Sequence, residues 1–438
     1  MAQLFDMILK NATVVNHDGT GRRDIGICDG RIAALGDLSL ASAPEILNCT
    51  GLHIVPGIID SQVHFREPGL EHKEDLESGS FSAVLGGVTA VFEMPNTVPC
   101  TVSAEMLADK VRRAHHRMHC DFAFWLGATR ENTRYIGELE YLPGAAGIKV
   151  FTGSSTGNLL VDDDESIRTI LKNTRRRTAF HSEDEARLKK RKHLRVAGDV
   201  SSHSIWRDEM TALHSTERLA RIARETGACI HVLHVSTAEE INFLKDHKDI
   251  ATLEITPHHL TFTTDDYANL GTLIQMNPPV RSIRHQNALW MSVERGIVDV
   301  IGSDHAPHTL EEKKYIYPSS PSGMTGVQTM VPIMLDYVNA RRLTLERFVD
   351  LTSHGPNRIF GINRKGRISV GYDADLTIID MKRHGTITND VTASKVGWTP
   401  YHGTTVTGWP IGTIIRGYRV MWDGEVITPA IGEPIEFS

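Results

Sequence analysis

Short apolar runs alternate with amphipathic stretches over most of this 438-residue chain, and that alternation limits the folds open to it. The apolar runs lie near residues 58–64, 88–94, 121–127, 146–151, 178–182, 229–235, 251–257 and 298–303. Patterns of helical period separate most of them, for example at 103–115, 165–173, 217–226 and 237–245. Eight buried strands that alternate with helices predict an α/β fold of the (β/α)8 class, a TIM-like barrel, which typically occupies ~250 residues.

The two ends of the chain carry a different pattern. Short alternating strands around Asp-Gly turns fill the region before about residue 55, and the same pattern returns after about residue 365. Each end alone has too few strands for a core of its own, so we expect both ends to pair in one small β-sandwich domain. The predicted organisation is a barrel at 56–365 with sandwich parts at 1–55 and 366–438.

Charge and cysteine content exclude several classes of protein. The formal net charge is −7, which disfavours nucleic acid or an anionic membrane as a partner, because such binding depends on Lys and Arg. The five cysteines are scattered and include no C-x-x-C pair, so neither a disulfide framework nor a thiolate zinc cluster is indicated. No apolar run approaches the ~18 residues of a membrane span, and the N-terminus lacks a secretory pattern. We therefore expect a cytoplasmic protein that acts on a small molecule.

Two basic runs, Arg175–Arg177 and Arg187–Arg195, are the features most suggestive of a nucleic-acid site. Both interrupt helical patterns in an acidic protein. We therefore interpret them as solvated faces and expect no nucleic-acid partner.

Polar, chemically active side chains stand where the predicted strands end. They are His64 and Arg66 after the first strand, Asn96 after the second, Lys149 in the fourth, His181 in the fifth, His234 in the sixth, and Asp304 and His308 after the eighth. In a barrel these ends converge on one face, which is where barrel enzymes keep their active sites. Three imidazoles and a carboxylate in one cup are typical of a divalent metal site, and zinc is the first choice.

Lys149 does not fit a simple metal site. An ammonium group has no lone pair and repels a dication. Lys149 can act as a ligand only if CO2 carbamylates it, because the modified side chain is a carboxylate that can bridge two ions. A salt bridge or a Schiff-base role is the alternative interpretation of this residue.

The chain has 22 histidines, and most of them need no catalytic role. His231 alternates with His234, and only one side-chain direction along a strand points to the barrel axis, so we do not expect His231 to be a ligand. The histidine clusters at 115–119 and 258–259 are interpreted as structural in the same way.

Five short motifs stand in a fixed order along the chain. They are His-Phe-Arg-Glu-Pro-Gly at 64–69, Met-Pro-Asn-Thr-Val-Pro at 94–99, Lys-Val-Phe at 149–151, Asn-Pro-Pro-Val-Arg at 277–281 and Ser-Asp-His-Ala-Pro-His at 303–308. Together they resemble dihydroorotases, a branch of the amidohydrolase superfamily, and the resemblance covers essentially the whole chain. The segment Gly-Tyr-Asp-Ala-Asp-Leu from Gly371 is similar to the superfamily's returning sandwich strand. Each motif is weak alone, but their order is specific.

The resemblance implies roles for individual residues. The implied metal ligands are His64, carbamylated Lys149, His181, His234 and Asp304, which would hold one or two Zn²⁺ ions per subunit. The implied substrate contacts are Arg66, Asn96, Asn277 and His308, with the stretch 321–326 covering the ring. A guanidinium such as that of Arg66 matches a carboxylate bidentately, which a lysine cannot do.

The activity that the resemblance implies is reversible hydrolysis of a cyclic amide, between L-dihydroorotate and N-carbamoyl-L-aspartate in pyrimidine biosynthesis. Asp304 would be the catalytic base and acid. The alternative enzyme is an allantoinase or hydantoinase, although those relatives generally lack the arginine of His-Phe-Arg. A third hypothesis is a catalytically inactive assembly partner with the same fold. The family habit also implies a homodimer.

One position departs from the family pattern. Gln62 stands where the first histidine of the family's His-x-His is found. A carboxamide oxygen is a poorer zinc ligand than imidazole, so we expect one ion to be weakly held, bound through Gln62 or water, or absent. Because only this ligand is replaced, we expect an active enzyme.

Overall fold

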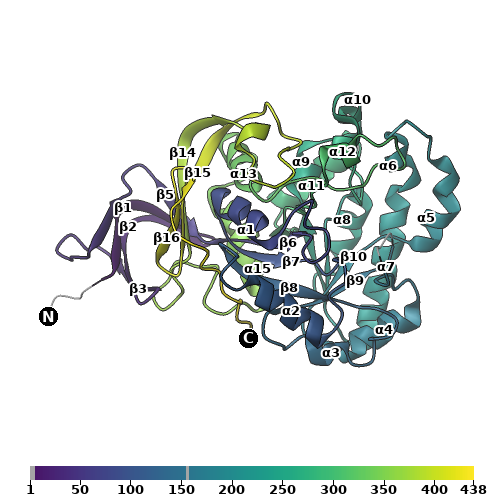
Figure 1. Cartoon of the computed structure of the whole chain (residues 1–438), viewed down its shortest axis with the longest axis horizontal. Coiled ribbons are helices and arrows are strands. Elements are labelled where there is room, and N and C mark those ends of the chain that lie inside the picture. The colour runs from purple at the N-terminus through teal and green to yellow at the C-terminus, as the bar shows by residue number, and fades with distance from the viewer. Residues whose placement is uncertain (1–4, 154–156) are drawn as a thin grey trace.

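In the computed structural model, which describes residues 5–153 and 157–438, an eight-stranded barrel lies beside a second sheet (Figure 1). Residues 1–4 lie outside the described residues. They are part of the N-terminal segment for which we expected no secretory pattern. Among the described residues, no helix is both long and apolar enough to cross a membrane. The predicted fold class is confirmed, since both chain ends contribute strands to the second sheet.

The barrel strands are parallel and follow one another in chain order. They are β6 (Ile58–Val63), β7 (Val88–Glu93), β8 (Asp121–Gly127), β9 (Ala145–Phe151), β10 (Thr178–His181), β11 (Ile230–Val232), β12 (Ala251–Ile255) and β13 (Val300–Ile301). Every residue in them is buried, as expected for strands covered on both faces. The N–H of His64 donates to the carbonyl of His305 at 2.7 Å, which joins the last strand to the first.

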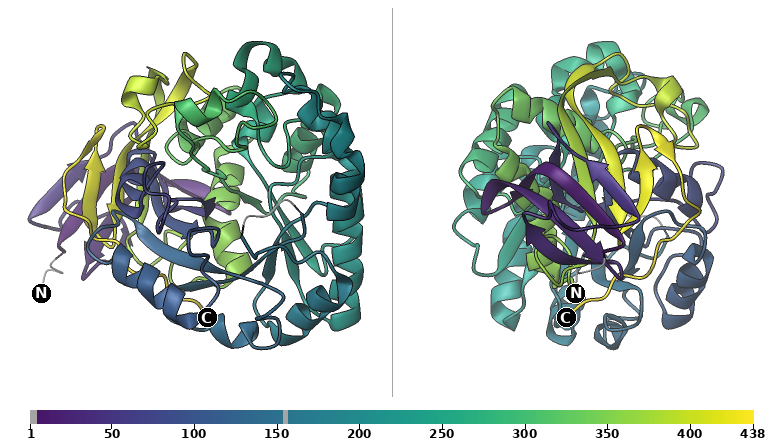
Figure 2. Two further views of the ribbon diagram at one scale, coloured as in Figure 1. Left: turned by 45° about the vertical axis from the view of Figure 1, so that its right-hand side comes forward. Right: turned by 90° about the vertical axis from the view of Figure 1, so that its left-hand side faces the viewer.

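Helices surround the barrel (Figure 2). They are α1 (Leu76–Leu85), α2 (Ala104–Ala114), α3 (Ile136–Leu139), α4 (Asp164–Asn173), α5 (Glu185–Arg191), α6 (Ser202–Trp206), α7 (Glu209–Thr226), α8 (Ala238–Leu244), α9 (Pro257–Thr261), α10 (Tyr267–Leu270), α11 (Ile283–Glu294), α12 (Leu310–Lys313), α13 (Met330–Asn339), α14 (Leu345–Val349) and α15 (Gly355–Phe360). Helix α7 begins eight residues before its predicted start at 217, where Asp208 caps it by accepting from the N–H of Thr211. Its first two turns bury the polar residues Thr211 and Ser215. Because these residues interrupt the apolar periodicity, the sequence pattern did not reveal the start of the helix.

Aromatic side chains fill the end of the barrel where the strands begin. Phe92 packs against Phe360 of α15 and Phe437 of the C-terminal segment, with ring centroids 5.4 and 5.6 Å apart. That segment is tied to β8, because the N–H of Ile435 donates to the carbonyl of Phe122 at 2.9 Å. This packing leaves the opposite end, where the strands finish, for a site.

The second sheet is mixed and runs in the order β17-β16-β15-β14-β5-β1-β2-β3, with β4 paired to β1. Its strands are β1 (Met7–Asn16), β2 (Gly19–Cys28), β3 (Arg31–Gly36), β4 (Glu45–Asn48), β5 (His53–Pro56), β14 (Leu376–Thr386), β15 (Thr405–Ile415), β16 (Tyr418–Trp422) and β17 (Glu425–Val426). The two chain ends meet where β5 pairs with β14, and apolar residues from both ends form one core. Neither end builds this core alone, which is the predicted reason for their pairing.

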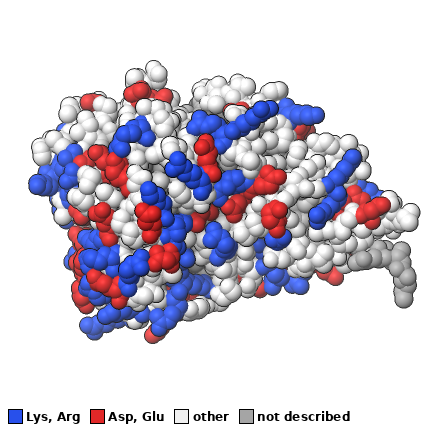
Figure 3. All heavy atoms as spheres, turned by 180° about the vertical axis from the view of Figure 1, so that it is seen from behind, with Lys and Arg blue, Asp and Glu red and all other residues white. Residues whose placement is uncertain are grey.

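The two basic runs lie in different surroundings. Arg176 and Arg177 are partly buried, and each donates to a backbone carbonyl of a barrel strand at 3.1 Å. The interpretation of this run as a solvated face is therefore wrong for these two residues, because their side chains reach back to β9 and β11. On α5, Arg187 pairs with Asp208 at 2.8 Å. Figure 3 shows basic and acidic side chains interspersed on one face of the molecule.

Candidate active site

A pocket of about 270 Å³ opens where the barrel strands end, and all nine predicted site residues line it. His64 and Arg66 follow β6, Asn96 follows β7, Lys149 lies in β9, His181 ends β10, His234 follows β11, Asn277 follows β12, and Asp304 and His308 follow β13. Gln62, the penultimate residue of β6, lines the pocket as well. The barrel therefore brings together predicted site residues that are up to 244 positions apart in the sequence, counted from His64 to His308.

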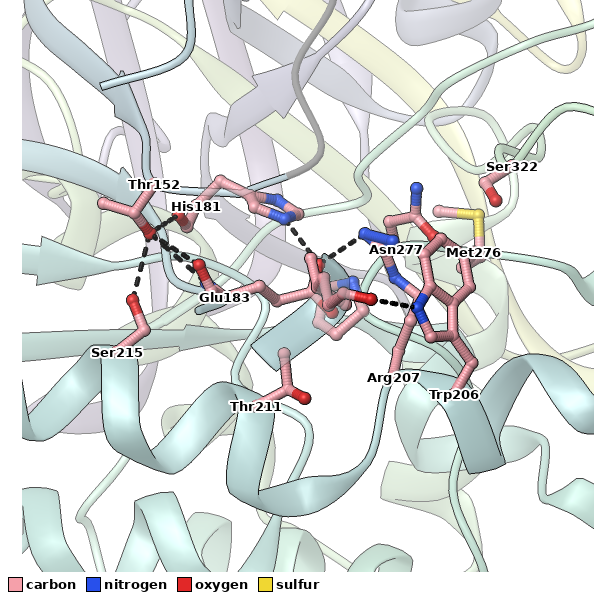
Figure 4. A network of polar contacts seen from close by, with 12 residues as sticks. Thr152, His181, Glu183, Trp206, Arg207, Thr211, Ser215, Met276, Asn277 and Ser322 are labelled. Atoms are coloured by element: carbon pink, nitrogen blue, oxygen red, sulfur yellow. Dashed lines mark hydrogen bonds and ion pairs between the residues drawn. The ribbon is translucent and has the colours of Figure 1, made fainter. Parts of the chain in front are cut away.

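His181 is held by a buried carboxylate that the sequence did not single out. Its Nε2 lies 2.7 Å from Glu183 Oε2, and Arg207 donates to the same oxygen at 2.7 Å (Figure 4). Burial alone would raise the pKa of Glu183, but Arg207 and His181 outweigh burial and lower that pKa to about 2. Because an ionised carboxylate only accepts hydrogen bonds, Nε2 of His181 carries the proton and Nδ1 keeps its lone pair.

The free nitrogen of His181 faces His234. Its Nδ1 lies 3.0 Å from Nε2 of His234. Two nitrogen ligands of a tetrahedral zinc ion, at ~2.0–2.1 Å from the metal, lie ~3.3 Å apart. Burial lowers the pKa of both imidazoles, so they are neutral at pH 7, which is the form that binds metals. This pair has the spacing and protonation state of two ligands to one divalent ion.

A second pair of donors consists of His64 and Asp304. Asn96 Oδ1 lies 2.8 Å from Nδ1 of His64, so Nδ1 carries the proton and Nε2 keeps a lone pair. That Nε2 lies 3.2 Å from Asp304 Oδ1. Two acceptors at this distance are stable together only with a cation or a proton between them. The donor set therefore fits a divalent ion here too.

Gln62 contributes its amide nitrogen to the carboxylate of the second pair. Its Nε2 donates to Asp304 Oδ1 at 2.9 Å. Its Oε1 is buried and has no hydrogen-bond partner within the described ranges. A buried oxygen without a partner beside this pair of donors is available as a weak metal ligand, so the role expected for Gln62 stays a prediction.

Lys149 lines the same pocket as the two pairs of donors and is buried. Its Nζ has no hydrogen-bond partner in the described part of the chain, and it lies 4.5 Å from the ring centroid of Phe151. Burial lowers its pKa to about 7, although the nearby carboxylates of Asp304 and Glu254 oppose this. A large fraction of this amine is therefore neutral at physiological pH, and the neutral amine is the form that reacts with CO2.

The opposite side of the pocket presents nitrogen donors. Arg66 is buried, and its Nε donates to the carbonyl of Pro307 at 3.2 Å. Lys73 donates to Nδ1 of His308 at 3.1 Å, and Nε2 of His308 lies 3.1 Å from the carbonyl of Ser322 and 3.3 Å from Nη2 of Arg66. Burial lowers the pKa of Arg66 to about 10, which leaves the guanidinium charged at neutral pH. This end of the pocket suits an anion.

Asn277 is oriented by a buried histidine of α6. Nε2 of His203 lies 2.9 Å from both the carbonyl of Met276 and Oδ1 of Asn277. Both partners are acceptors, so Nε2 of His203 carries the proton. This hydrogen bond holds Oδ1 of Asn277 toward His203. The NH2 group of Asn277 is then the part of this side chain that is free to meet a ligand.

Three pocket residues adopt a backbone conformation that non-glycine residues rarely adopt. Arg66, His234 and Asp304 have φ values of 64°, 38° and 47°. Such strain of order 1–3 kcal/mol per residue collects at functional sites, where the surrounding structure imposes it. His234, which has the smallest of these φ values, follows β11 and lines the pocket. His231 lies outside the pocket, 5.2 Å from the ring of Phe360, as expected.

Several residues that support the pocket were not predicted from the sequence. Glu183 was detectable, because it follows His181 by two positions and a carboxylate commonly supports a metal-ligating histidine. Arg207, His203 and Lys73 gave no comparable signal. Their importance depends on contacts made across the fold.

Comparisons with known proteins identify the family to which this chain belongs. The model of the amidohydrolase family matches residues 53–420, so the chain belongs to that family. It is 33% identical over 429 residues to a dihydroorotase of Methanothermobacter thermautotrophicus, covering 97% of this chain and 96% of that protein. It is 35% identical over 414 residues to a dihydroorotase of Pyrococcus furiosus, covering 94% and 92%.

A solved structure agrees with this assignment. The L-hydantoinase (dihydropyrimidinase) from Arthrobacter aurescens superposes with a TM-score of 0.94 at 30% sequence identity, and the match covers 98% of this chain and 99% of that one. The predicted membership of the amidohydrolase family is confirmed. The similarity extends over the barrel and the second sheet together.

Proposed function

We propose that this protein is a dihydroorotase, which hydrolyses L-dihydroorotate to N-carbamoyl-L-aspartate and closes the ring in the reverse direction. The observation that carries the proposal is the buried, charged guanidinium of Arg66 in the same pocket as the metal-binding pairs. Dihydroorotate carries a carboxylate on its ring, whereas hydantoin and allantoin do not. Arg66 forms bidentate hydrogen bonds with such a group, and His308 and Asn96 lie beside it.

The proposed cofactor is Zn²⁺, one or two ions per subunit. The residues that would hold it are His64, Lys149 in carbamylated form, His181, His234 and Asp304, with the oxygen of Gln62 as a weaker donor. When bound, the ion lowers the pKa of a water molecule and withdraws electron density from the amide carbonyl.

Asp304 moves the proton in the proposed reaction. Gln62 donates to its Oδ1, which leaves Oδ2 to accept the proton of the attacking water. As the water oxygen bonds to the ring carbonyl carbon and the C–N bond breaks, Asp304 returns that proton to the departing nitrogen. Ring closure follows the same steps in reverse: Asp304 first accepts a proton from the attacking nitrogen as a base, and then donates it as an acid to the departing hydroxyl group, which leaves as water. Meanwhile Arg66 and Asn277 hold the substrate in place.

The test of this function is Arg66→Ala, assayed with dihydroorotate, hydantoin and allantoin side by side. Truncation of one partner of a buried charge pair costs about 2–5 kcal/mol, so kcat/KM for dihydroorotate should fall about 30- to 5,000-fold. Metal content, measured by elemental analysis, should not change, because Arg66 contacts no predicted ligand atom. Arg66→Lys should not restore the activity, since an ammonium cannot pair bidentately.

Two outcomes would contradict the proposal. A wild type that prefers hydantoin or allantoin would support the alternative enzyme. A wild type with full metal occupancy and no turnover of any of the three would support the inactive assembly partner.

A further inference from the structure

Lys313, at the end of α12, is a buried ammonium group that the proposed mechanism does not use. Its side chain is about 1% exposed. Its Nζ donates to the carbonyls of Pro321 at 2.9 Å and Gly323 at 2.8 Å, and it lies 3.5 Å from the carbonyl of Gln275. Pro321 and Gly323 both line the pocket, so Lys313 supports the pocket wall from behind.

Among the described residues, Lys313 has no ion-pair partner. Glu312 is adjacent in the sequence but pairs with Lys73 at 2.9 Å, and none of the described carboxylates forms an ion pair with Lys313. Burial and the charge of Arg66 together lower the pKa of Lys313 to about 7, although Glu312 opposes them. Support of a loop requires hydrogen-bond donors but not a buried positive charge, which is costly unless it is compensated. An anion in the pocket would raise this pKa and favour the charged form of Lys313.

Two segments that line the pocket meet at Lys313. Gln275 precedes Met276 and Asn277, and its side chain exchanges hydrogen bonds with Ser320, at 2.9 Å to the carbonyl and 2.6 Å from the hydroxyl. The N–H of Gly323 also donates to the carbonyl of Gln275 at 2.9 Å. Lys313 therefore joins the segment 275–277 to the segment 321–323.

The same lysine lies on the anion-binding side of the pocket. Its Nζ is 5.9 Å from the ring centroid of Trp398, and the indole N–H of Trp398 donates to the carbonyl of His308 at 2.7 Å. Lys313 and the backbone of His308 thus share one aromatic support. The charges of Arg66 and Lys313 act on each other and on His308, so these three basic side chains lie near one another.

We propose that Lys313 is a positioning and specificity residue: it joins the two pocket walls and adds a buried positive charge that favours cyclic amides with a carboxylate over neutral ones. This inference rests on the proposed function, because it assumes an anionic substrate. Lys313 acts through the walls and through its field, and no contact with the substrate is required.

The decisive variant is Lys313→Gln, which retains hydrogen-bond donors and removes the charge. We would measure kcat and KM for dihydroorotate, and the inhibition constant of 5,6-dihydrouracil, which is the same ring without the carboxylate. The KM for dihydroorotate should rise about tenfold while kcat changes less than about threefold, because a fixed charge acts on binding of the anion. The inhibition constant of dihydrouracil should change less than about threefold, since a neutral ring does not sense the lost charge.

Two further variants complete the experiment. Lys314→Gln removes a charge from the exposed neighbouring position and should leave all three constants unchanged. Lys313→Met removes both the charge and the donors, and it should lower kcat in addition because the walls lose their connection. Thermal melting shows whether each variant is folded. If Lys313→Gln is not folded, Lys313→Met is used to test the role of the charge.

The outcomes separate the inference from the function on which it rests. If Lys313→Gln weakens dihydroorotate and dihydrouracil by the same factor, or weakens neither, the charge has no role in selection and the inference is wrong. If the wild type does not turn over dihydroorotate at all, the proposed function fails instead.

Discussion

Replacement of Glu183 by glutamine tests whether this carboxylate supports metal binding by the predicted ligand His181. Glu183→Gln keeps the shape of the side chain but removes the charge that accepts from His181 and Arg207, both at 2.7 Å. A charge-assisted hydrogen bond contributes about 1.5–3 kcal/mol and a neutral one keeps about 1 kcal/mol, so loss of charge in two bonds should destabilise the fold by about 1–4 kcal/mol. Loss of a carboxylate behind a metal-ligating histidine weakens metal binding about 10- to 100-fold.

Two measurements on the apoprotein check this prediction. Zinc affinity is measured by competition with a chelator of known affinity, and stability by denaturant unfolding without metal. The matched control is Glu165→Gln on α4, where the side chain is 82% exposed and the same charge is removed. The control should change neither quantity by more than experimental error.

A double variant separates the two effects. Arg207→Met in the Glu183→Gln background removes the buried charge that was left without its partner, so part of the stability should return while metal affinity stays low. Wild-type zinc affinity in Glu183→Gln would refute the reasoning, because His181 would then bind metal without help from the carboxylate.

Two further predictions concern the metal site. Gln62→His should raise zinc occupancy toward two ions per chain by elemental analysis, because imidazole is the better donor, and an unchanged occupancy would show that Gln62 does not limit it. Lys149→Ala should lose both metal and activity, and added acetate or propionate should partly restore them; full occupancy without Lys149 would exclude a bridging role. The pKa of Lys149 is lowered to about 7 by burial. The neutral fraction of the amine is therefore about tenfold larger at pH 8 than at pH 6. After removal of CO2 and metal, the protein should regain activity correspondingly faster at pH 8 when CO2 and zinc are supplied at equal concentrations.

The sequence determined the barrel and the position of its site. Each predicted apolar run overlaps a strand of the barrel, because strands covered on both faces must be apolar along their length. In a parallel barrel every strand ends on the same face. The sequence alone therefore places a polar residue at the end of an apolar run on that face. For this reason the pocket contains His64, Lys149 and Asp304 together.

Only the tertiary structure decided how these side chains are held. Arg207 reaches Glu183 from the segment between α6 and α7, and Trp398 reaches His308 from a segment 90 positions later in the chain. Lys313 gains its significance from the carbonyls that face it and from the absence of a carboxylate partner among the described residues. The start of α7 was hidden in the same way, since its first turns bury polar residues. Periodicity reports which residues face the interior, but hydrogen-bond partners and buried charges depend on which distant segments the fold brings into contact.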